Sequence, residues 1–210
     1  MDKAVHRLEA LSETEKNRML EMFVNSFEAE PMFRFMFQDA NKRREQIRWA
    51  VEKKFKLMAN RYEIYTIGDG IQGFSWWFSP EKSTGTSITQ QLLAGYGLAP
   101  FKMGIKTFRR MYYCGDHEQK LLKKYADYDC WLLDVIAVDP SQQGQGLGKL
   151  LMQPVFEKAD EAQKDCVVLT HNQRNKIFYE KCGFKLINIE GFSLGNVEAF
   201  VLKRDPGLRS

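Results

Sequence analysis

The sequence has 210 residues, of which 44% are hydrophobic and 13% aromatic, so it can bury a sizeable core, and its length suits one domain better than two. Its 31 Lys and Arg residues against 27 Asp and Glu give a formal net charge of +4. This charge is too small to indicate nucleic acid as the main partner, but it is compatible with an anionic small molecule.

The start of the chain has no pattern of a secretory signal, because Asp2 and Lys3 follow Met1 and no apolar run with a cleavage site comes after them. No apolar run approaches the roughly 18 residues that cross a membrane. We therefore expect a cytoplasmic protein that binds no membrane. The cysteines match neither a zinc pattern nor a dense disulfide framework, which predicts packed, reduced thiols and no metal: Cys114, Cys130, Cys166 and Cys182.

The N-terminal half is predicted to be largely helical. Apolar residues recur at helical spacing over residues 13–37, and Pro31 divides this stretch into two helices. Residues 41–61 predict a basic amphipathic helix. Its basic face could recognise a polyanion such as RNA, although solvated faces of this kind are more common. A further helical insertion is expected at about 88–126.

A β-hairpin is expected between these helical parts. Residues 62–67 and 71–78 are rich in aromatic and β-branched side chains, and Gly68-Asp69-Gly70 supplies the turn. Trp76 and Trp77 lie on opposite faces of the second strand, so at most one of them can line a cleft while the other packs.

The C-terminal half has the pattern of alternating strands and helices. Residues 131–138 form a nearly continuous apolar run, which is typical of a strand covered on both faces. A glycine-rich loop and a helix from Leu147 come next. The remaining elements are expected to be a buried strand at 166–170, a helix at 176–182, and strands at 184–190 and 196–203.

The loop after the apolar strand has glycines at alternating positions, Gly144, Gly146 and Gly148, and it leads into a helix. Such a loop directs several backbone N–H groups at one point, and Lys149 can add a full positive charge, so the loop suits an anion. A glycine-rich turn without a ligand is the alternative.

Two other phosphate-binding patterns fail on this loop. The dinucleotide pattern Gly-x-Gly-x-x-Gly would need glycine where Lys149 or Leu151 stands. A P-loop would need glycine in place of Gln143 and Ser or Thr in place of Leu150.

The segment Gln143-x-x-Gly146-x-Gly148, after a strand that ends Ala137-Val138-Asp139-Pro140, resembles the acetyl-coenzyme A signature of the GNAT superfamily of N-acetyltransferases. Residues 170–184 are similar to a later motif of that family, with Asn175, Tyr179 and Gly183-Phe184 in register. The two motifs cover about 131–184. The chain also looks similar to the puromycin-acetyltransferase-like branch.

The resemblance implies a single α/β (α+β) domain over 1–210, with a mixed central sheet whose fourth and fifth strands splay apart between flanking helices. Residues 1–130 would form the acceptor-side half, with the helical insertion, and 131–203 the acetyl-coenzyme A-binding half. The pantetheine arm would lie between the splayed strands and the pyrophosphate on the loop. The implied cofactor-binding residues are Ile136, Ala137, Val138, Gln143, Gly144, Gln145, Gly146, Leu147, Gly148, Lys149, Asn172, Asn175 and Phe178.

Acetyl transfer needs a neutral amine, yet an alkyl amine with a pKa near ~10 is only about one part in a thousand neutral at pH 7. A base must therefore remove a proton, and an acid assists the departing thiolate. The resemblance gives the acid role to Tyr179, whose alternative is a core tyrosine with a satisfied hydroxyl. His171 could join a proton relay, but a surface-loop histidine is the favoured interpretation.

The base is expected to be Asp134, because it is the only charge within residues 131–138 and burial raises a carboxylate's pKa. Its parity with Leu132, Ile136 and Val138 predicts that all four share one face. Relatives place a carboxylate where this chain has Leu132, and close relatives place another at Leu169, so the sequence departs from them. A structural ion pair with an arginine is the alternative role for Asp134.

The function expected from the sequence is acetyl transfer from acetyl-coenzyme A to a primary amine of a small molecule, by direct attack in a ternary complex. The alternatives are a protein or peptide N-acetyltransferase and a non-catalytic acyl-coenzyme A sensor. We expect a monomer or homodimer without a nucleic-acid partner.

Overall fold

The computed structural model describes residues 4–68, 70–80, 86–126, 129–192 and 197–207. The strands are β1 (Val5–Arg7), β2 (Tyr62–Ile67), β3 (Gly73–Phe78), β4 (Trp131–Val138), β5 (Cys166–Thr170), β6 (Lys185–Gly191) and β7 (Glu198–Arg204). They form one seven-stranded sheet of order β1-β2-β3-β4-β5-β7-β6. Only β4 and β5 pair in parallel within this described sheet, which confirms the predicted mixed sheet.

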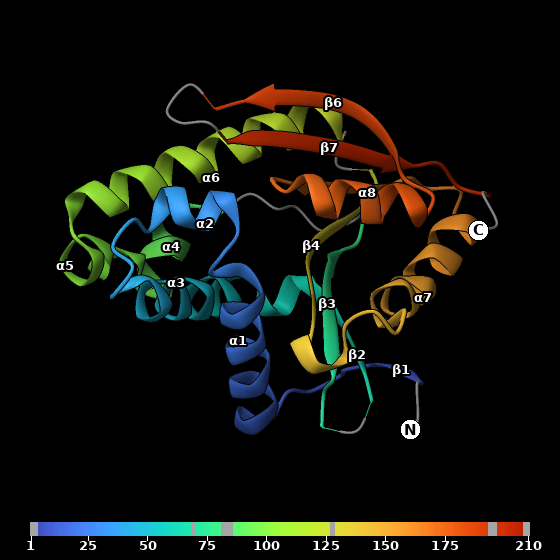
Figure 1. The fold of residues 1–210 in the computed structure, drawn as a ribbon, viewed down its shortest axis with the longest axis horizontal. Helices are drawn as coiled ribbons and strands as arrows, with labels where there is room; N and C mark the ends of the chain where they lie inside the picture. Colours follow the sequence, from blue (N-terminus) through green and yellow to red (C-terminus); the bar gives the residue numbers. More distant parts are fainter. Residues whose placement is uncertain (1–3, 69, 81–85, 127–128, 193–196, 208–210) are drawn as a thin grey trace.

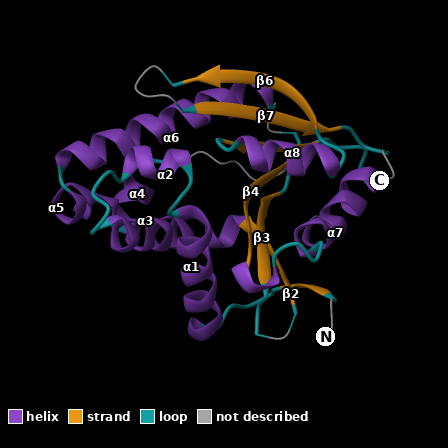
Figure 2. Ribbon diagram, viewed as in Figure 1, coloured by secondary structure: helices purple, strands orange, loops and turns teal. Residues whose placement is uncertain are grey.

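Helices cover both faces of the sheet (Figure 2). They are α1 (Glu13–Phe27), α2 (Pro31–Met36), α3 (Arg43–Met58), α4 (Ile88–Ala94), α5 (Ala99–Met103), α6 (Ile105–Tyr125), α7 (Leu147–Glu161) and α8 (Gln173–Lys181), with short 3-10 helices η1 (Ala59–Arg61), η2 (Tyr96–Leu98) and η3 (Pro140–Gln142). Pro31 begins α2, at a position where the missing N–H costs no helical hydrogen bond.

The predicted elements are present with small differences at their ends. The helical insertion is confirmed and consists of α4, α5 and α6. Strand β1 was not predicted, since three largely exposed residues carry almost no pattern. Two residues of the predicted elements, Asp69 of the hairpin turn and Asn196 at the start of the last strand, lie outside the described residues.

The sheet separates two main cores. In Figure 1, α1 and α3 lie on one side of β2, β3 and β4, and α7 lies on the other. Trp76 packs in the core with α1 and α3, whereas Trp77 packs in the core with α7 and α8, so the predicted opposite faces are confirmed. Both indole rings are fully buried, and neither of them lines an open surface.

A β-bulge interrupts β4 at Asp134. Trp76 is paired with Val135 and Trp77 with Leu133, which leaves Asp134 without a partner on β3. The extra residue shifts the alternation of side chains along the strand by one position.

The bulge corrects the predicted face of Asp134. Ile136 and Val138 pack against the α7 core, but Asp134 contacts residues of α3 and β2 on the other face. Simple alternation along residues 131–138 therefore gave the wrong face for Ile136 and Val138 relative to Asp134.

Helix α6 of the insertion runs alongside the β6–β7 hairpin (Figure 1), while residues of α5 pack in the core around α1 and α3. A small core joins α6 to α2 and to the residues around the hairpin, and it consists of Met32, Cys114, Leu121, Phe192, Val197 and Ala199.

The four cysteines are buried, as predicted, and no disulfide joins them. Of the helices in the described part of the chain, none has the length and apolar character that crossing a membrane requires.

We predict that Asp160→Asn lowers the free energy of unfolding by about 2 kcal/mol, because it removes the negative charge that accepts both hydrogen bonds from the buried guanidinium of Arg204. Arg204 is 2% exposed and donates two hydrogen bonds of 2.8 Å to Asp160. As a control, Asp116→Asn removes an exposed pair with Lys120 and should cost less than about 0.5 kcal/mol. Urea unfolding measures both values, and equal losses would contradict the prediction.

Candidate active site

The candidate site begins where β4 and β5 separate. The two strands pair only at Trp131 with Cys166, Leu132 with Val167 and Leu133 with Val168. On its other edge β4 stays paired with β3 as far as Val138. Residues 134–138 therefore present a backbone edge that β5 does not cover, and the predicted splay of the fourth and fifth strands is confirmed.

The glycine loop is held at its start by Asp139. Its carboxylate accepts from the backbone N–H of Ser141 at 3.0 Å and from the Ser141 hydroxyl at 2.7 Å. Arg18 of α1 also donates to it at 2.6 Å. The Ser141 hydrogen bonds, with a smaller contribution from Arg18, hold the pKa of Asp139 below its usual range. The loop is thereby fixed to both β4 and α1.

The backbone conformation and the close packing of the loop explain why glycine occupies positions 144, 146 and 148. Gly144 and Gly146 have φ of 81° and 79°, where a side chain would be strained, and a Cβ on either would meet no atom within 4 Å. At Gly148 a Cβ would lie 3.0 Å from Cζ of Phe178, so this glycine allows α8 to approach the start of α7.

The loop also leaves backbone donors available. Within the described chain, the N–H groups of residues 144–148 donate no hydrogen bond to protein. Gly146 is the N-cap of α7 and has no side chain to cap it. These N–H groups at a helix N-terminus suit an anion such as a pyrophosphate.

The structure places Asn172 and Asn175 next to a carboxylate that the sequence analysis missed. Asn172 caps α8 by accepting from the N–H of Arg174 at 2.8 Å, and its Nδ2 donates to both oxygens of Glu30 at 2.9 and 2.8 Å. Asn175 donates to Glu30 at 3.4 Å. Glu30 precedes Pro31 at the start of α2, and only the tertiary fold brings it to α8. Cofactor contacts of the two asparagines stay predictions.

Tyr179 lies on α8 within the α7 core, with its ring edge-on to Phe184 and tilted against Phe178. Burial raises the pKa of Tyr179 well above its usual value, and Cys182 and Glu30 raise it further. The phenol therefore keeps its proton at any physiological pH. Among the described residues its hydroxyl has no hydrogen-bond partner, so the proton is available for donation.

Asp134 is held in an ion pair. Its Oδ1 accepts from Nζ of Lys54 at 2.8 Å, and its Oδ2 accepts from the hydroxyl of Tyr62 at 2.5 Å. Desolvation alone would lower the pKa of Lys54, but the carboxylates of Asp134 and Glu118 outweigh it and raise that pKa. The alternative of a structural ion pair is thus present, with a lysine in place of the expected arginine.

Glu118 of α6 is a second carboxylate that sequence reasoning missed. Its Oε1 lies 3.7 Å from Nε2 of His171, the residue directly after β5. Although 36% of the side chain is exposed, partial desolvation raises the pKa of Glu118 to about 7, Lys54 opposes this rise, and Asp134 adds to it. No signal in the sequence indicates Glu118, because Asp116-His117-Glu118 has the polar composition of an ordinary exposed stretch of helix.

His171 is not a surface residue, which corrects the expectation from the sequence. Its side chain is 9% exposed and meets the ring of Phe192 edge-on. Burial, with a contribution from His117, lowers the pKa of His171 to about 3, so the imidazole is neutral.

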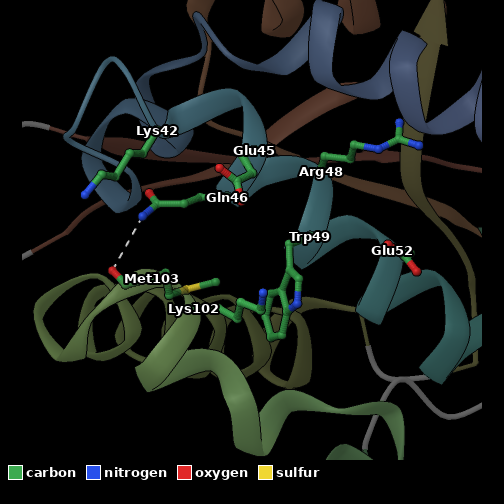
Figure 3. Close-up of a pocket in the computed structure, with 8 residues that line it drawn as sticks. All are labelled: Lys42, Glu45, Gln46, Arg48, Trp49, Glu52, Lys102 and Met103. Atoms are coloured by element: carbon green, nitrogen blue, oxygen red, sulfur yellow. Dashed lines mark hydrogen bonds between the residues drawn. The ribbon is translucent and has the colours of Figure 1, made fainter.

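A separate pocket lies between α3 and α5 (Figure 3) and shares no residue with the groups described above. Gln46 spans it and donates to the carbonyl of Met103 at 3.5 Å. Acidic and basic side chains alternate in its lining, which consists of Lys42, Glu45, Gln46, Arg48, Trp49, Glu52, Lys102 and Met103. Arg44 and Arg48 also pair with Glu28 and Glu21, so the basic face of α3 is largely compensated.

Residues 110–186 match the family model of the acetyltransferase (GNAT) domain. This segment includes β4, the glycine loop, α7, β5 and α8, and therefore both motifs recognised in the sequence.

Solved structures over the full chain share the fold. One from Corynebacterium glutamicum, described as histone acetyltransferase HPA2 and related acetyltransferase, has a TM-score of 0.65 and 14% identity, and the match covers 100% of this chain and 99% of the other. An aminoglycoside 6'-N-acetyltransferase complexed with coenzyme A has a TM-score of 0.54 and 10% identity, with 99% of both chains covered.

A probable serine/threonine-protein kinase of Dictyostelium discoideum is 22% identical over an alignment of 206 residues that covers 87% of this chain. The match spans only 22% of that relative's length. The family model confirms the resemblance seen in the sequence: residues 110–186 match a GNAT acetyltransferase domain, the domain of acetyl-coenzyme A-dependent acyltransferases, and the shared fold agrees with it.

Proposed function

We propose that this domain transfers acetyl from acetyl-coenzyme A to a primary amine of a small molecule, by direct attack in a ternary complex. The observation that carries the proposal is the uncovered edge of β4 at residues 134–138, which leads directly into a loop of unpaired N–H groups. A long, narrow ligand with an amide-bearing arm and a pyrophosphate has the chemistry that such an edge and loop would bind.

In this proposal the arm pairs with the backbone of Ile136 to Val138, and the N–H groups of residues 144–148 hold the pyrophosphate. The acetyl thioester supplies the electrophile. Tyr179 keeps its proton because its pKa is raised, so it can protonate the sulfur as the C–S bond breaks.

The charges near the split, which is the place beyond Leu133 and Val168 where β4 and β5 separate, favour a cationic acceptor. Three carboxylates come from three different elements, namely Glu30 before α2, Glu118 on α6 and Asp134 on β4, and Lys54 compensates only one of them. An amine that arrives as an ammonium ion is attracted by this excess of negative charge.

The position of α6 favours a small acceptor over a peptide. The helix packs against α2 and against the residues around the β6–β7 hairpin, and His117 faces Glu190 of β6 at 3.7 Å. An open groove for an extended chain would need this side of the split to be free of such contacts. The similar structures do not decide the matter, because their descriptions include both a histone and an aminoglycoside acetyltransferase.

We expect release of coenzyme A thiol when the protein is assayed with acetyl-coenzyme A and a panel of small primary amines. Turnover should be lower on histone-type peptides than on the best small amine, since α6 and α2 close the acceptor side. Preference for peptides would favour the protein N-acetyltransferase alternative. Coenzyme A binding without turnover on any acceptor would favour the sensor.

We predict that Gly146→Glu abolishes acetyl-coenzyme A binding, because it places an anion and bulk where the pyrophosphate should lie. Gly146→Ala is the matched control. Both variants carry the same backbone strain of about 1–2 kcal/mol at a φ of 79°, but only the glutamate adds charge. Calorimetry should show binding by the alanine variant alone, and full affinity of the glutamate variant would remove the loop from the site.

We predict that Tyr179→Phe lowers kcat by at least about tenfold, the lower end of what a lost general acid costs, while cofactor affinity stays nearly unchanged. Tyr65→Phe is the control. Tyr65 is buried in the same core, but its hydroxyl donates to Glu63 at 2.8 Å, so its loss should not affect kcat. Wild-type turnover of the Tyr179 variant would remove this residue from the mechanism.

A further inference from the structure

Glu118 faces groups from both strands at the point where they separate. Asp134 is the first residue of β4 beyond its last pair with β5, and His171 is the first residue after β5. The carboxylate of Glu118 lies 3.7 Å from the imidazole of His171 and interacts electrostatically with Asp134 and Lys54. Helix α6 thus places a titratable group at the point where β4 and β5 separate.

Asp134 and Glu118 differ in the number of carboxylate lone pairs that remain free to accept a hydrogen bond or a proton. Both oxygens of Asp134 already accept hydrogen bonds, from Lys54 and from Tyr62. Glu118 has no hydrogen-bond partner among the described residues, and its side chain is still 36% exposed. A carboxylate with free lone pairs and access from outside can take a proton from a ligand, whereas one held by two donors stabilises the structure.

We propose that Glu118 is the general base of the acetyl transfer and accepts a proton from the ammonium form of the acceptor. The proposal rests on the proposed function. Glu118 takes one proton from the ammonium ion and later releases it to water. The neutral nitrogen then forms the C–N bond, the C–S bond breaks, and the sulfur takes the proton of Tyr179. The phenol is restored by the second proton that leaves the nitrogen.

The surrounding charges support this role. Lys54 pairs with Asp134, so an ionised Glu118 adds a negative charge that this pair does not cancel and that attracts an ammonium ion. His171 is neutral, and its Nε2 is buried without a hydrogen bond in the described structure. The phenols of Tyr62 and Tyr96 stay protonated, because burial raises the pKa of Tyr96 to about 12 and that of Tyr62 well above its usual value.

The test is the pH dependence of kcat/KM for the best small amine. A base with a pKa of about 7 is protonated and inactive below that pH and active above it, so wild-type kcat/KM should rise through neutrality. Glu118→Gln should lose this limb and fall about 100-fold in kcat/KM at high pH. Glu118→Asp should keep the limb at a reduced rate, which a purely structural role does not predict.

Glu190→Gln is the matched control. It removes a carboxylate that faces His117, the neighbour of Glu118 on α6, and it should leave the pH profile unchanged. Calorimetry with coenzyme A should give the same affinity for Glu118→Gln as for the wild type. An unchanged pH profile and rate in Glu118→Gln would overturn the proposal while the proposed function stands.

A wild-type protein that acetylates no amine would instead overturn the proposed function. The Glu118 carboxyl can then be titrated by carbon-13 NMR with coenzyme A present, and the Glu118→Gln variant assigns its signal. The midpoint of this titration tests whether Glu118 can accept a proton, independently of turnover. A midpoint near neutrality supports a group able to accept a proton there. A midpoint near the ordinary glutamate value of about 4.3 overturns the proposal.

Discussion

Strand β4 is shared between two neighbours that part from each other, and the site depends on this division. With β3, β4 pairs from Leu132 to Val138 except at the bulged Asp134, but with β5 it makes only three residue pairs. Strand β5 is paired instead along all five of its residues with β7, and so it follows the hairpin. The sheet therefore opens beyond Leu133, and the polar edge of β4 that results is the natural place for a ligand with backbone-like amides.

Several features of this arrangement could be predicted from the sequence because they are local. The apolar run at 131–138 gives β4 its limits, and the glycines at 144, 146 and 148 give the loop its conformation and its free N–H groups. The parity of Asp134 could not be predicted, since the bulge arises from the pairing of β4 with Trp76 and Trp77 on β3. A one-residue shift in a strand changes every face beyond it.

The acceptor side was harder to predict for a different reason. Glu30 precedes α2, Lys54 lies on α3 and Glu118 lies on α6, and they have no shared spacing in the sequence. Only the packing of these helices brings them to their partners Asn172, Asp134 and His171. His171 was assigned to the surface for the same reason, because the covering residue, Phe192, follows it by a whole helix and strand. Local patterns carry no information about such contacts.

The packing of Leu132 and Leu169 explains physically why these two positions, where the resemblance implies a carboxylate, are apolar. Leu132 packs with Phe78 and Val167 in a closed apolar cluster, where a carboxylate would lose its hydration without gaining a partner. Leu169 packs along the edge of the same cluster. With these two sheet positions apolar, negative charge at the split has to come from Asp134 at the bulge and from the helices. Because Lys54 compensates Asp134, the charge that remains to act on an acceptor is supplied by helical elements. In the proposed mechanism the insertion therefore has two roles, because α6 closes the acceptor side and also supplies the proton acceptor Glu118.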